Sequence, residues 1–359
     1  MTNWNVPAIS SAKNLERSKS RRKRVSAMQW ALIGASTIAS QFMIDAIRAQ
    51  AGNRVASVLS SSAERGKAYA GEHDIPEAFT DLDEQLAQDV DAVYISTTNE
   101  KHFPQAMAAI EAGKHVLCEK PLAMTVEDAI TMVRAAEAAG VQFATNHHLR
   151  NAGSHLKIKD LIASGRVGKV QAIRVAHAVY LPPHLQGWRI DNPEAGGGVI
   201  PDIVVHDADT VRFHLDEDPA EVMAMERADS LGQGVEDSVM SVWQMPSGVT
   251  VQTHEGFTIR HAGTGFEVHG TEGSIFARNV MTQQSIGEIR LVTESGQETV
   301  PFSDHNLYTR AVGLYVDACA GKGTPAATGV DGVKSLAVAA AVKKSATSGA
   351  RVAVDYGGI

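Results

Sequence analysis

The feature of the sequence that most constrains the fold is a regular alternation of short apolar runs and amphipathic segments between residues 28 and 148. Apolar runs of this length are typical of buried strands, and the segments between them have the 3.6-residue spacing of helices. Because neighbouring parallel strands need long right-handed connections, this order predicts an α/β domain with a parallel sheet and helices on both faces. The predicted strands are residues 30–33, 55–59, 91–96, 115–119 and 141–145, and the predicted helices are 36–49, 63–73, 104–112 and 126–139.

The pattern changes after about residue 150, where strand-like runs follow one another with turn residues between them. Successive strands of this kind predict a large open sheet that is mainly antiparallel, in an α+β domain. We therefore expect one domain at residues 28–148 and a second at 149–359, with its last helix packing back on the first. The predicted strands are 170–179, 221–227, 237–245, 249–255, 265–269, 274–277 and 289–292, and the predicted helices are 154–164, 203–214, 307–320 and 332–347.

Charge and composition exclude several classes of protein. The net charge of −8 disfavours a nucleic-acid partner. No apolar run approaches the roughly 18–20 residues of a membrane-spanning helix. Cys118 and Cys319 stand far apart, so they predict neither a disulfide framework nor a zinc site, and we expect a cytoplasmic protein. Residues 1–27 are basic and lack the apolar segment of a secretory signal, which predicts a disordered extension.

The turn after the first predicted strand carries a dinucleotide-binding pattern. The usual fingerprint is Gly-x-Gly-x-x-Gly/Ala, and here Gly34 and Ala39 occupy the first and third positions while Ser36 replaces the middle glycine. Serine is small enough for a phosphate to approach, and the start of the following helix offers free N–H groups. The sequence therefore predicts a Rossmann nucleotide-binding domain whose phosphate turn is Gly34, Ala35, Ser36, Thr37 and Ile38.

The end of the second predicted strand indicates which nucleotide is bound. NAD sites place an acid there for the ribose diol, whereas this chain has Ser60, Ser61 and, a little further on, Arg65. Hydroxyl donors and a guanidinium suit a 2′-phosphate, which a carboxylate would repel. Glu64 is expected to lie on the helix beyond the strand tip. We therefore predict NADP rather than NAD as the cofactor.

Three further motifs carry a family resemblance. They are Ser96-Thr97-Thr98-Asn99, Glu119-Lys120-Pro121, and the glycine segment Gly196–Asp202 followed by His206-Asp207. Together they resemble the glucose–fructose oxidoreductase and inositol dehydrogenase family, over residues 28 to about 350. The resemblance implies a nucleotide-binding domain followed by a substrate and oligomerisation domain. Residues 146–150 and 178–189 are most similar to a bacterial branch of that family, whose members reduce the C2 ketone of a cyclic sugar with NADPH.

The expected catalytic residues are Lys120, Asp202 and His206. Lys120 ends a predicted strand, where open α/β sheets bind ligands, and the resemblance implies that its ammonium points at the reacting carbonyl. Asp202 and His206 are four residues apart on a predicted helix and so share one face. Either Lys120 or His206 is able to give the proton that the reduced oxygen needs, and the sequence leaves this open. Asp209 lies nearby, but we predict no metal.

The other predicted site residues surround these three. We expect Ser96, Thr97, Thr98, Asn99 and His102 to form the loop beside the nicotinamide, with Glu119 and Asn146 supporting the cofactor and Trp188 and Arg189 closing over it. Together with Lys120, Asp202 and His206, the residues expected to line the substrate cleft are His147, Tyr180 and His184.

These expectations lead to one main hypothesis and two alternatives. The main hypothesis is NADPH-dependent reduction of a cyclic sugar ketone. The second is an NAD(P)-dependent inositol or aldose dehydrogenase, and the third is an NADP-binding sensor without catalysis. Retention of Lys120, Asp202 and His206 argues against the sensor, which would not need proton-transfer groups. A monomer and a homo-oligomer both remain open.

Overall fold

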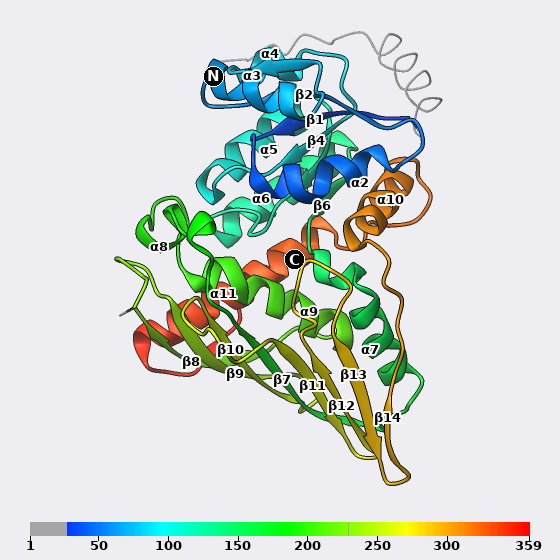
Figure 1. Cartoon of the computed structure of the whole chain (residues 1–359). Helices are drawn as coiled ribbons and strands as arrows, with labels where there is room; N and C mark the ends of the chain where they lie inside the picture. Colours follow the sequence, from blue (N-terminus) through cyan, green and yellow to red (C-terminus); the bar gives the residue numbers. More distant parts are fainter. Residues whose placement is uncertain (1–26, 229) are drawn as a thin grey trace, which may run out of the picture.

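The computed structural model describes residues 27–228 and 230–359. The basic extension predicted at residues 1–27 lies outside the described residues, apart from Ala27. Two sheets divide the molecule, with a parallel sheet in the upper lobe of Figure 1 and a larger sheet below it. Among the described residues, no helix is both long and apolar enough to cross a membrane.

The first sheet is parallel and has the order β3-β2-β1-β4-β5-β6. Its central strands are buried on both faces, which explains why they read as continuous apolar runs in the sequence. The predicted Rossmann fold is confirmed. Its strands are β1 (Gln29–Ile33), β2 (Arg54–Leu59), β3 (Glu77–Phe79), β4 (Ala92–Ile95), β5 (His115–Cys118) and β6 (Phe143–Thr145).

Helices cover both faces of this sheet. One face packs against α2 (Ile44–Arg48) and α10 (Leu307–Cys319). Trp30 packs here against Tyr315 with the two rings tilted, and it donates its indole N–H to Asn53 at 2.9 Å. The other face packs against α5 (His102–Glu111), α6 (Val126–Ala139) and α11 (Gly329–Ser348). Each large apolar side chain buried here contributes about 1.5–3 kcal/mol. The two C-terminal helices thus close the nucleotide-binding domain from opposite sides.

Two elements between β2 and β4 were not anticipated from the sequence, namely β3 and α4 (Leu82–Leu86). The strand is three residues long, lies at the sheet edge and leaves Glu77 and Ala78 exposed, so it shows no apolar run.

The predicted helix after β1 also differs in detail, because it contains a π-helical turn at Ala39–Met43 before α2. A further helix, α3 (Ala63–Glu72), is capped by Ser62, whose side chain accepts from the Arg65 N–H.

The second sheet is mixed and has the order β14-β13-β12-β11-β7-β10-β9-β8-β15. β7 and β10 are parallel neighbours and the other pairings are antiparallel, so the expectation of a mainly antiparallel sheet is confirmed. Its strands are β7 (Val170–Ala178), β8 (Glu221–Arg227), β9 (Ser238–Gln244), β10 (Thr250–Gly256), β11 (Gly265–Gly270), β12 (Gly273–Arg278), β13 (Glu288–Thr293), β14 (Gly296–Thr299) and β15 (Val352–Ala353).

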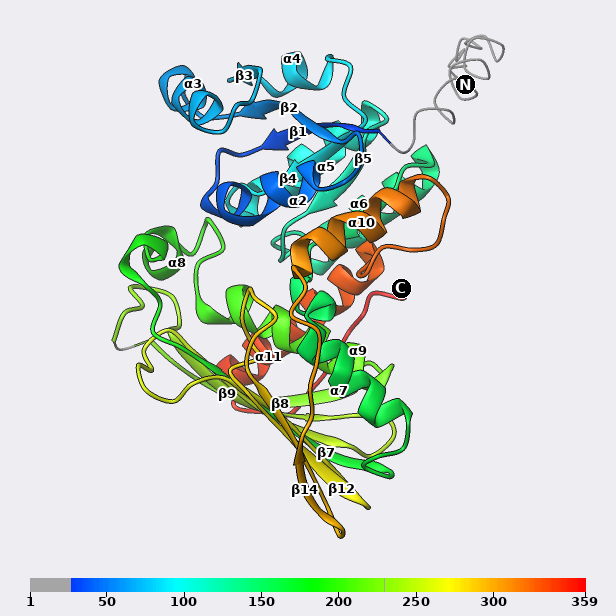
Figure 2. The same cartoon turned by 45° about the vertical axis from the view of Figure 1, so that its right-hand side comes forward.

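Helices lie on the face of this sheet that is turned toward the first domain. α7 (Gly153–Ala163), α9 (Val205–Leu215) and α11 occupy the space between the two sheets in Figures 1 and 2. Their apolar residues join the inward residues of the strands in one buried cluster that includes Ile158, Val211 and Trp243. The outer face leaves Met223, Met225 and other large apolar side chains exposed. The layering therefore places α9, which carries His206, against the first domain.

Candidate active site

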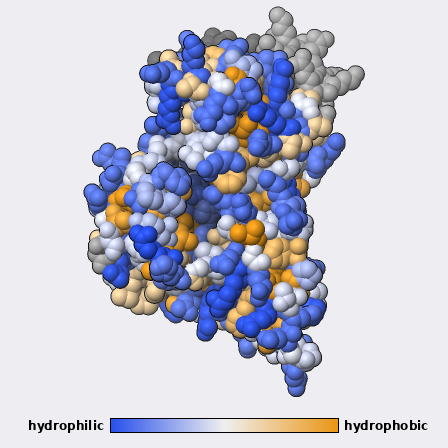
Figure 3. All heavy atoms as spheres, in the orientation of Figure 1, coloured by the Kyte–Doolittle hydropathy of each residue, from blue (hydrophilic) through white to orange (hydrophobic). Residues whose placement is uncertain are grey.

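The candidate site lies where the carboxyl ends of the parallel strands face the second domain, and Figure 3 shows the surface hollowed where the two domains meet. Glu119 and Lys120 follow β5 directly, and the Lys120–Pro121 peptide bond is cis. The carboxylate of Glu119 accepts from Tyr94 Oη at 2.5 Å and from Asn146 Nδ2 at 2.6 Å. These bonds fix the chain on either side of the β5 end, and so they orient Lys120.

Lys120 reaches across the domain boundary to Asp202. Its Nζ donates to the Asp202 carboxylate at 2.8 Å and to the Asp202 carbonyl at 2.9 Å. Arg189 approaches the other carboxylate oxygen at 3.6 Å. Burial raises the pKa of Asp202, but the charges of Lys120 and Arg189 outweigh it and leave the pKa below its usual range. Asp202 is therefore ionised at neutral pH and holds two cations from different elements together.

His206 lies one helical turn beyond Asp202, in a group of histidine rings. Its ring centroid is 4.9 Å from that of His148, 6.2 Å from His177 and 6.3 Å from His147. Burial, followed by the charge of Lys120, lowers the pKa of His206 well below its usual value. The imidazole is therefore neutral at neutral pH. A neutral imidazole is able to accept one hydrogen bond and donate another.

Asp202 does not lie on the same regular helix as His206, as the sequence suggested. It belongs to a π-helical turn, Ile200–Val204, and α9 begins only at Val205. The glycine segment before it has a spatial reason. Gly196 has φ +84°, and a Cβ there would lie 2.7 Å from Asn99 and 2.9 Å from Met124. Asn99 Nδ2 donates to the Gly196 carbonyl at 3.0 Å, so the segment carrying Asp202 rests on the loop after β4.

The turn after β1 fits a dinucleotide phosphate. Gly34 has φ +115°, and a Cβ there would lie 3.2 Å from the Ser96 carbonyl group, so a larger residue would be strained. Ser36 Oγ accepts from the Ala39 N–H at 3.2 Å and shares a hydrogen bond with Ser96 Oγ at 2.7 Å. The side chain of Ser36 is thus already engaged. The free backbone N–H groups of the helix start, Thr37 and Ile38 included, are left as the phosphate donors.

The end of β2 offers a cation and a hydroxyl beside this turn. Arg65 Nη2 donates to the Ala35 carbonyl at 2.6 Å, which brings the guanidinium back from α3 to the phosphate turn. Ser61 is exposed at the strand tip, whereas Ser60 is buried and its backbone N–H pairs with Phe79. Arg65 and Ser61 are the side chains here that could contact the ribose of a bound nucleotide. Ser61 is the better placed of the two serines.

The loop after β4 is built from side chains that bind one another. Thr97 donates to Gln105 at 2.6 Å and Thr98 to Glu100 at 2.7 Å. His102 is fully buried, with its ring nitrogens 2.7 Å from the Pro121 carbonyl and 3.2 Å from the Thr97 carbonyl. His102 therefore ties the β4 loop to the β5 loop. Because its side chain is fully buried, this position does not support direct contact with the cofactor.

The segment after β7 closes the site from the second domain. The Arg189 guanidinium stacks on Trp188 at 4.6 Å, in the short helix α8 (Trp188–Asp191). Tyr180 is half-buried under the Arg260 guanidinium, 3.3 Å from its ring centroid. His184 is exposed. Arg189 thus contacts Asp202 of the Lys120–Asp202 pair, while Tyr180 and His184 come earlier in the same segment.

His147 occupies a different place from the one expected. It is only 3% exposed, and its Nε2 lies 2.9 Å from Ser335 Oγ and 3.8 Å from Asp209. Burial lowers the pKa of His147 to about 4, so the ring is neutral. It lies behind His206, and this position does not support a direct contact with the substrate.

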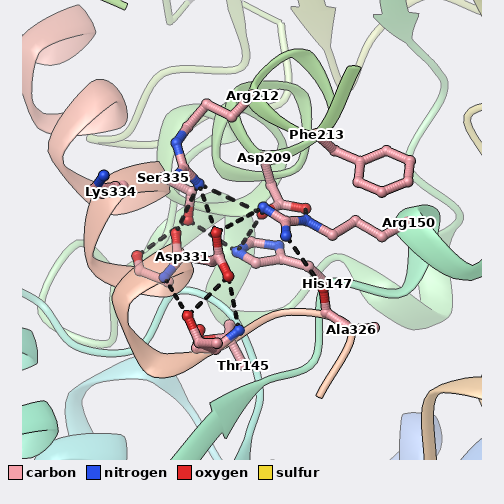
Figure 4. Close-up of polar contacts among 12 residues, drawn as sticks. Thr145, His147, Arg150, Asp209, Arg212, Phe213, Ala326, Asp331, Lys334 and Ser335 are labelled. Carbon is pink, nitrogen blue, oxygen red and sulfur yellow. Dashed lines mark hydrogen bonds and ion pairs between the residues drawn. The ribbon is translucent and has the colours of Figure 1, made fainter. Parts of the chain in front are cut away.

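A buried network of charges surrounds His147 (Figure 4). Arg150 Nε donates to Asp209 Oδ2 at 2.7 Å, and its Nη2 lies 2.7 Å from Asp209 Oδ1 and donates to Asp331 at 2.9 Å. Arg212 approaches Asp331 at 3.3 Å. Asp331 also belongs to the capping box that begins α11. The network joins the chain after β6, α9 and α11, and it was not predicted from the sequence. It fixes the helix that carries His206 to the nucleotide-binding domain.

Other residues that the sequence did not single out are His148 and His177. His148 stacks on Tyr308 at 5.4 Å and has its ring next to His206. His148 belongs to the run of polar residues after β6. Because ligands bind at the carboxyl ends of parallel strands, this run could have indicated His148 as a site residue. Within the described part of the chain, no group of acidic, histidine or cysteine side chains has the arrangement of a metal site. Asp209, considered as a ligand, pairs with Arg150.

The fold and this site define a family of oxidoreductases. Residues 28–147 match the profile of the oxidoreductase family with an NAD-binding Rossmann fold, and residues 155–276 match the Gfo/Idh/MocA C-terminal domain. The chain therefore belongs to the Gfo/Idh/MocA oxidoreductase family, and the resemblance inferred from the sequence motifs is confirmed.

Individual relatives give a finer comparison. The chain is 56% identical over 331 residues to the 1,5-anhydro-D-fructose reductase of Ensifer adhaerens, covering 92% of this chain and 99% of that protein. It is 30% identical to an inositol 2-dehydrogenase of Rhodococcus erythropolis, over 76% of this chain and 80% of that one. Among solved structures, the aldose–aldose oxidoreductase of Caulobacter crescentus superposes with a TM-score of 0.84 at 25% identity, covering 91% and 99% of the two chains.

Proposed function

We propose that this protein reduces the ketone of a cyclic sugar of the 1,5-anhydro-D-fructose type with NADPH. The observation that carries the proposal is the meeting of Lys120, Asp202 and His206 at the carboxyl end of the parallel sheet. The relative from Ensifer adhaerens, which matches over nearly its whole length, supports this substrate class. The two free thiols, Cys118 and Cys319, support a cytoplasmic location.

The preference for NADPH is supported by the β2 end. Arg65 lies over the phosphate turn, Ser61 is exposed beside it, and no carboxylate occupies the strand tip. Backbone N–H groups of the helix start, Thr37 and Ile38 included, would hold the pyrophosphate, and Trp188 and Arg189 would cover the nicotinamide side. When bound, the reduced nicotinamide supplies the hydride.

The proton comes from Lys120 in this proposal. Hydride addition places negative charge on the sugar oxygen, and a donor within hydrogen-bond reach must neutralise it. The Lys120 ammonium is held by Asp202 at the strand end, whereas burial keeps His206 neutral. We therefore assign Lys120 as the acid and His206 as a hydrogen-bonding partner of the sugar. Asp202 orients the ammonium.

The test compares Lys120→Met with the wild type on a panel of cyclic ketoses, inositols and aldoses, following NADPH absorbance. We expect kcat to fall by about 10²- to 10⁴-fold with the nucleotide affinity unchanged. Lys322→Met, at an exposed lysine far along the chain, is the matched control. Unchanged turnover in Lys120→Met would remove the catalytic assignment, and oxidation of inositols alone would favour the dehydrogenase alternative.

A further inference from the structure

The helical turn that carries Asp202 begins without a capping side chain from its own sequence. The turn spans Ile200–Val204, its N-cap residue is the apolar Val199, and the residue before that is Gly198. The first N–H groups of a helix have no carbonyl partner within it, so a buried helix start needs acceptors from elsewhere. Val199 and Ile200 are both buried, and their N–H groups therefore depend on another segment of the chain.

Glu236, in the connection between β8 and β9, supplies both acceptors. Its backbone carbonyl accepts from the Val199 N–H at 3.0 Å, and its Oε1 accepts from the Ile200 N–H at 3.1 Å. Gly198 leaves room for the carboxylate, because a Cβ there would lie 2.4 Å from Glu236 Oε1. A side chain 36 residues away in the sequence thus takes the place that a capping side chain usually fills.

The Glu236 carboxylate is itself fixed by a lysine from α11. Lys343 Nζ donates to Glu236 Oε2 at 2.8 Å and to Glu226, on β8, at 2.9 Å. Burial lowers the pKa of Lys343, but its hydrogen bonds to the two carboxylates outweigh this and leave the pKa above its usual value. The Glu236 side chain is 5% exposed and that of Glu226 is 25% exposed. Among the described residues, Glu226 makes no hydrogen bond to the Asp202 turn, so it shares the lysine without the capping role.

The neighbouring Asp237 anchors the connection that carries Glu236. Its Oδ2 accepts from the backbone N–H groups of residues 230–232 at distances between 2.7 and 3.0 Å, and Asp237 is only 1% exposed. The same connection reaches α8, because the Gln233 N–H donates to the Ile190 carbonyl at 2.6 Å. The carboxylate of Glu236 therefore projects from a segment that is bonded to its surroundings on both sides.

We propose that Glu236 is a positioning residue for the reduction, which caps the Asp202 turn from outside and so fixes the place of Lys120. Asp202 holds the Lys120 ammonium through its carboxylate at 2.8 Å and its carbonyl at 2.9 Å. Both acceptors belong to a residue only two positions beyond the capped Ile200 N–H, so a loosened turn start displaces them together. Glu236 acts through Asp202 and not on the sugar. The inference rests on the reductase function proposed above, in which Lys120 is the acid.

The kinetic test compares Glu236→Ala, Glu236→Gln and Glu226→Ala. In Glu236→Ala we expect kcat to fall by about 10- to 100-fold, because a shift of about 1 Å in a catalytic group is enough for losses of this size. The KM for NADPH should not change, since the phosphate turn and Arg65 belong to the first domain. Glu236→Gln keeps an oxygen for the Ile200 N–H and should stay within about threefold of the wild type. Glu226→Ala removes a partner of the same lysine without removing the cap, and should stay within about twofold.

A second comparison tests whether the effect passes through Asp202. In an Asp202→Asn background, adding Glu236→Ala is expected to lower kcat by less than about threefold, because residues that act in series are not additive. A further loss as large as in the wild-type background would overturn the proposal, as would an unchanged kcat in Glu236→Ala or an equal loss in Glu226→Ala. Glu236→Asp, whose carboxylate is one methylene shorter, gives the same kinetic test should Glu236→Ala fail to fold.

Hydrogen exchange of the Ile200 amide, followed by NMR without sugar, measures the cap independently of activity. Loss of a cap should make this exchange about 3- to 30-fold faster in Glu236→Ala, with no change in Glu226→Ala. Equal exchange in Glu236→Ala and the wild type would show that the carboxylate does not hold the turn. If the wild type reduces no sugar ketone, the proposed function fails, while the exchange rate still decides whether Glu236 caps the turn.

Discussion

Replacing Arg150 by Met tests whether the buried charge network supports the site. Arg150 is 9% exposed and pairs with Asp209, which is 1% exposed, through one hydrogen bond and one ion-pair contact, both of 2.7 Å. It also donates to Asp331 at 2.9 Å and to the Ala326 carbonyl at 3.1 Å. Methionine fills much of the volume but leaves the Asp209 carboxylate buried, with Arg212 3.9 Å away as its remaining cation.

Breaking one partner of a buried pair costs about 3–5 kcal/mol, because the other charge is left uncompensated. We expect Arg150→Met to lose this much free energy of unfolding in urea titrations followed by tryptophan fluorescence, with an unchanged slope. The matched control is Arg166→Met, which removes an exposed pair with Glu298 and should cost about 0–1 kcal/mol. Adding Asp209→Asn to Arg150→Met should recover part of the loss. A loss below about 1 kcal/mol in Arg150→Met would refute the reasoning.

Three further predictions concern the nucleotide site and acid stability. Arg65→Ala should weaken NADPH binding by about tenfold or more while leaving NADH binding unchanged, since charge-assisted hydrogen bonds to a 2′-phosphate are lost; fluorescence titration measures both constants, and an equal effect on NADH would contradict the assignment. Gly34→Ala should cost about 1–3 kcal/mol of stability and weaken nucleotide binding, because φ is +115° and the Cβ meets Ser96; a variant with wild-type melting temperature would argue against this strain. Burial raises the pKa of Asp331, but Arg150 and its other partners lower it below the usual range, so its contribution is present at neutral pH and is lost as pH falls below about 4. As the pH falls below about 4, the free energy of unfolding should therefore decrease less in Asp331→Asn than in the wild type. If the two proteins lose stability in parallel with falling pH in acid unfolding, this carboxylate is not responsible.

The features of the site that the sequence predicts are those that depend on neighbouring residues in the chain. The alternation of strands and helices, the turn at Gly34 and the placement of Lys120 at a strand end all depend on residues within one or two elements. Parallel strands bring their carboxyl ends to one edge, so these groups were expected together before any coordinates. Sequence reasoning missed β3 because a three-residue exposed edge strand carries no periodic signal.

The remainder depended on contacts between distant segments. Arg150 pairs with Asp209, 59 residues away, and with Asp331, 181 residues away, and neither spacing marks a partner. His147 and His148 are adjacent in the sequence, yet one ring bonds Ser335 behind His206 and the other packs against Tyr308. The sequence alone determined the parallel sheet, the nucleotide turn and the lysine at its edge, because local periodicity and strand polarity specify them. Only the tertiary structure decided which histidines are neutral and which carboxylates are paired, because burial and proximity set the charge of each group.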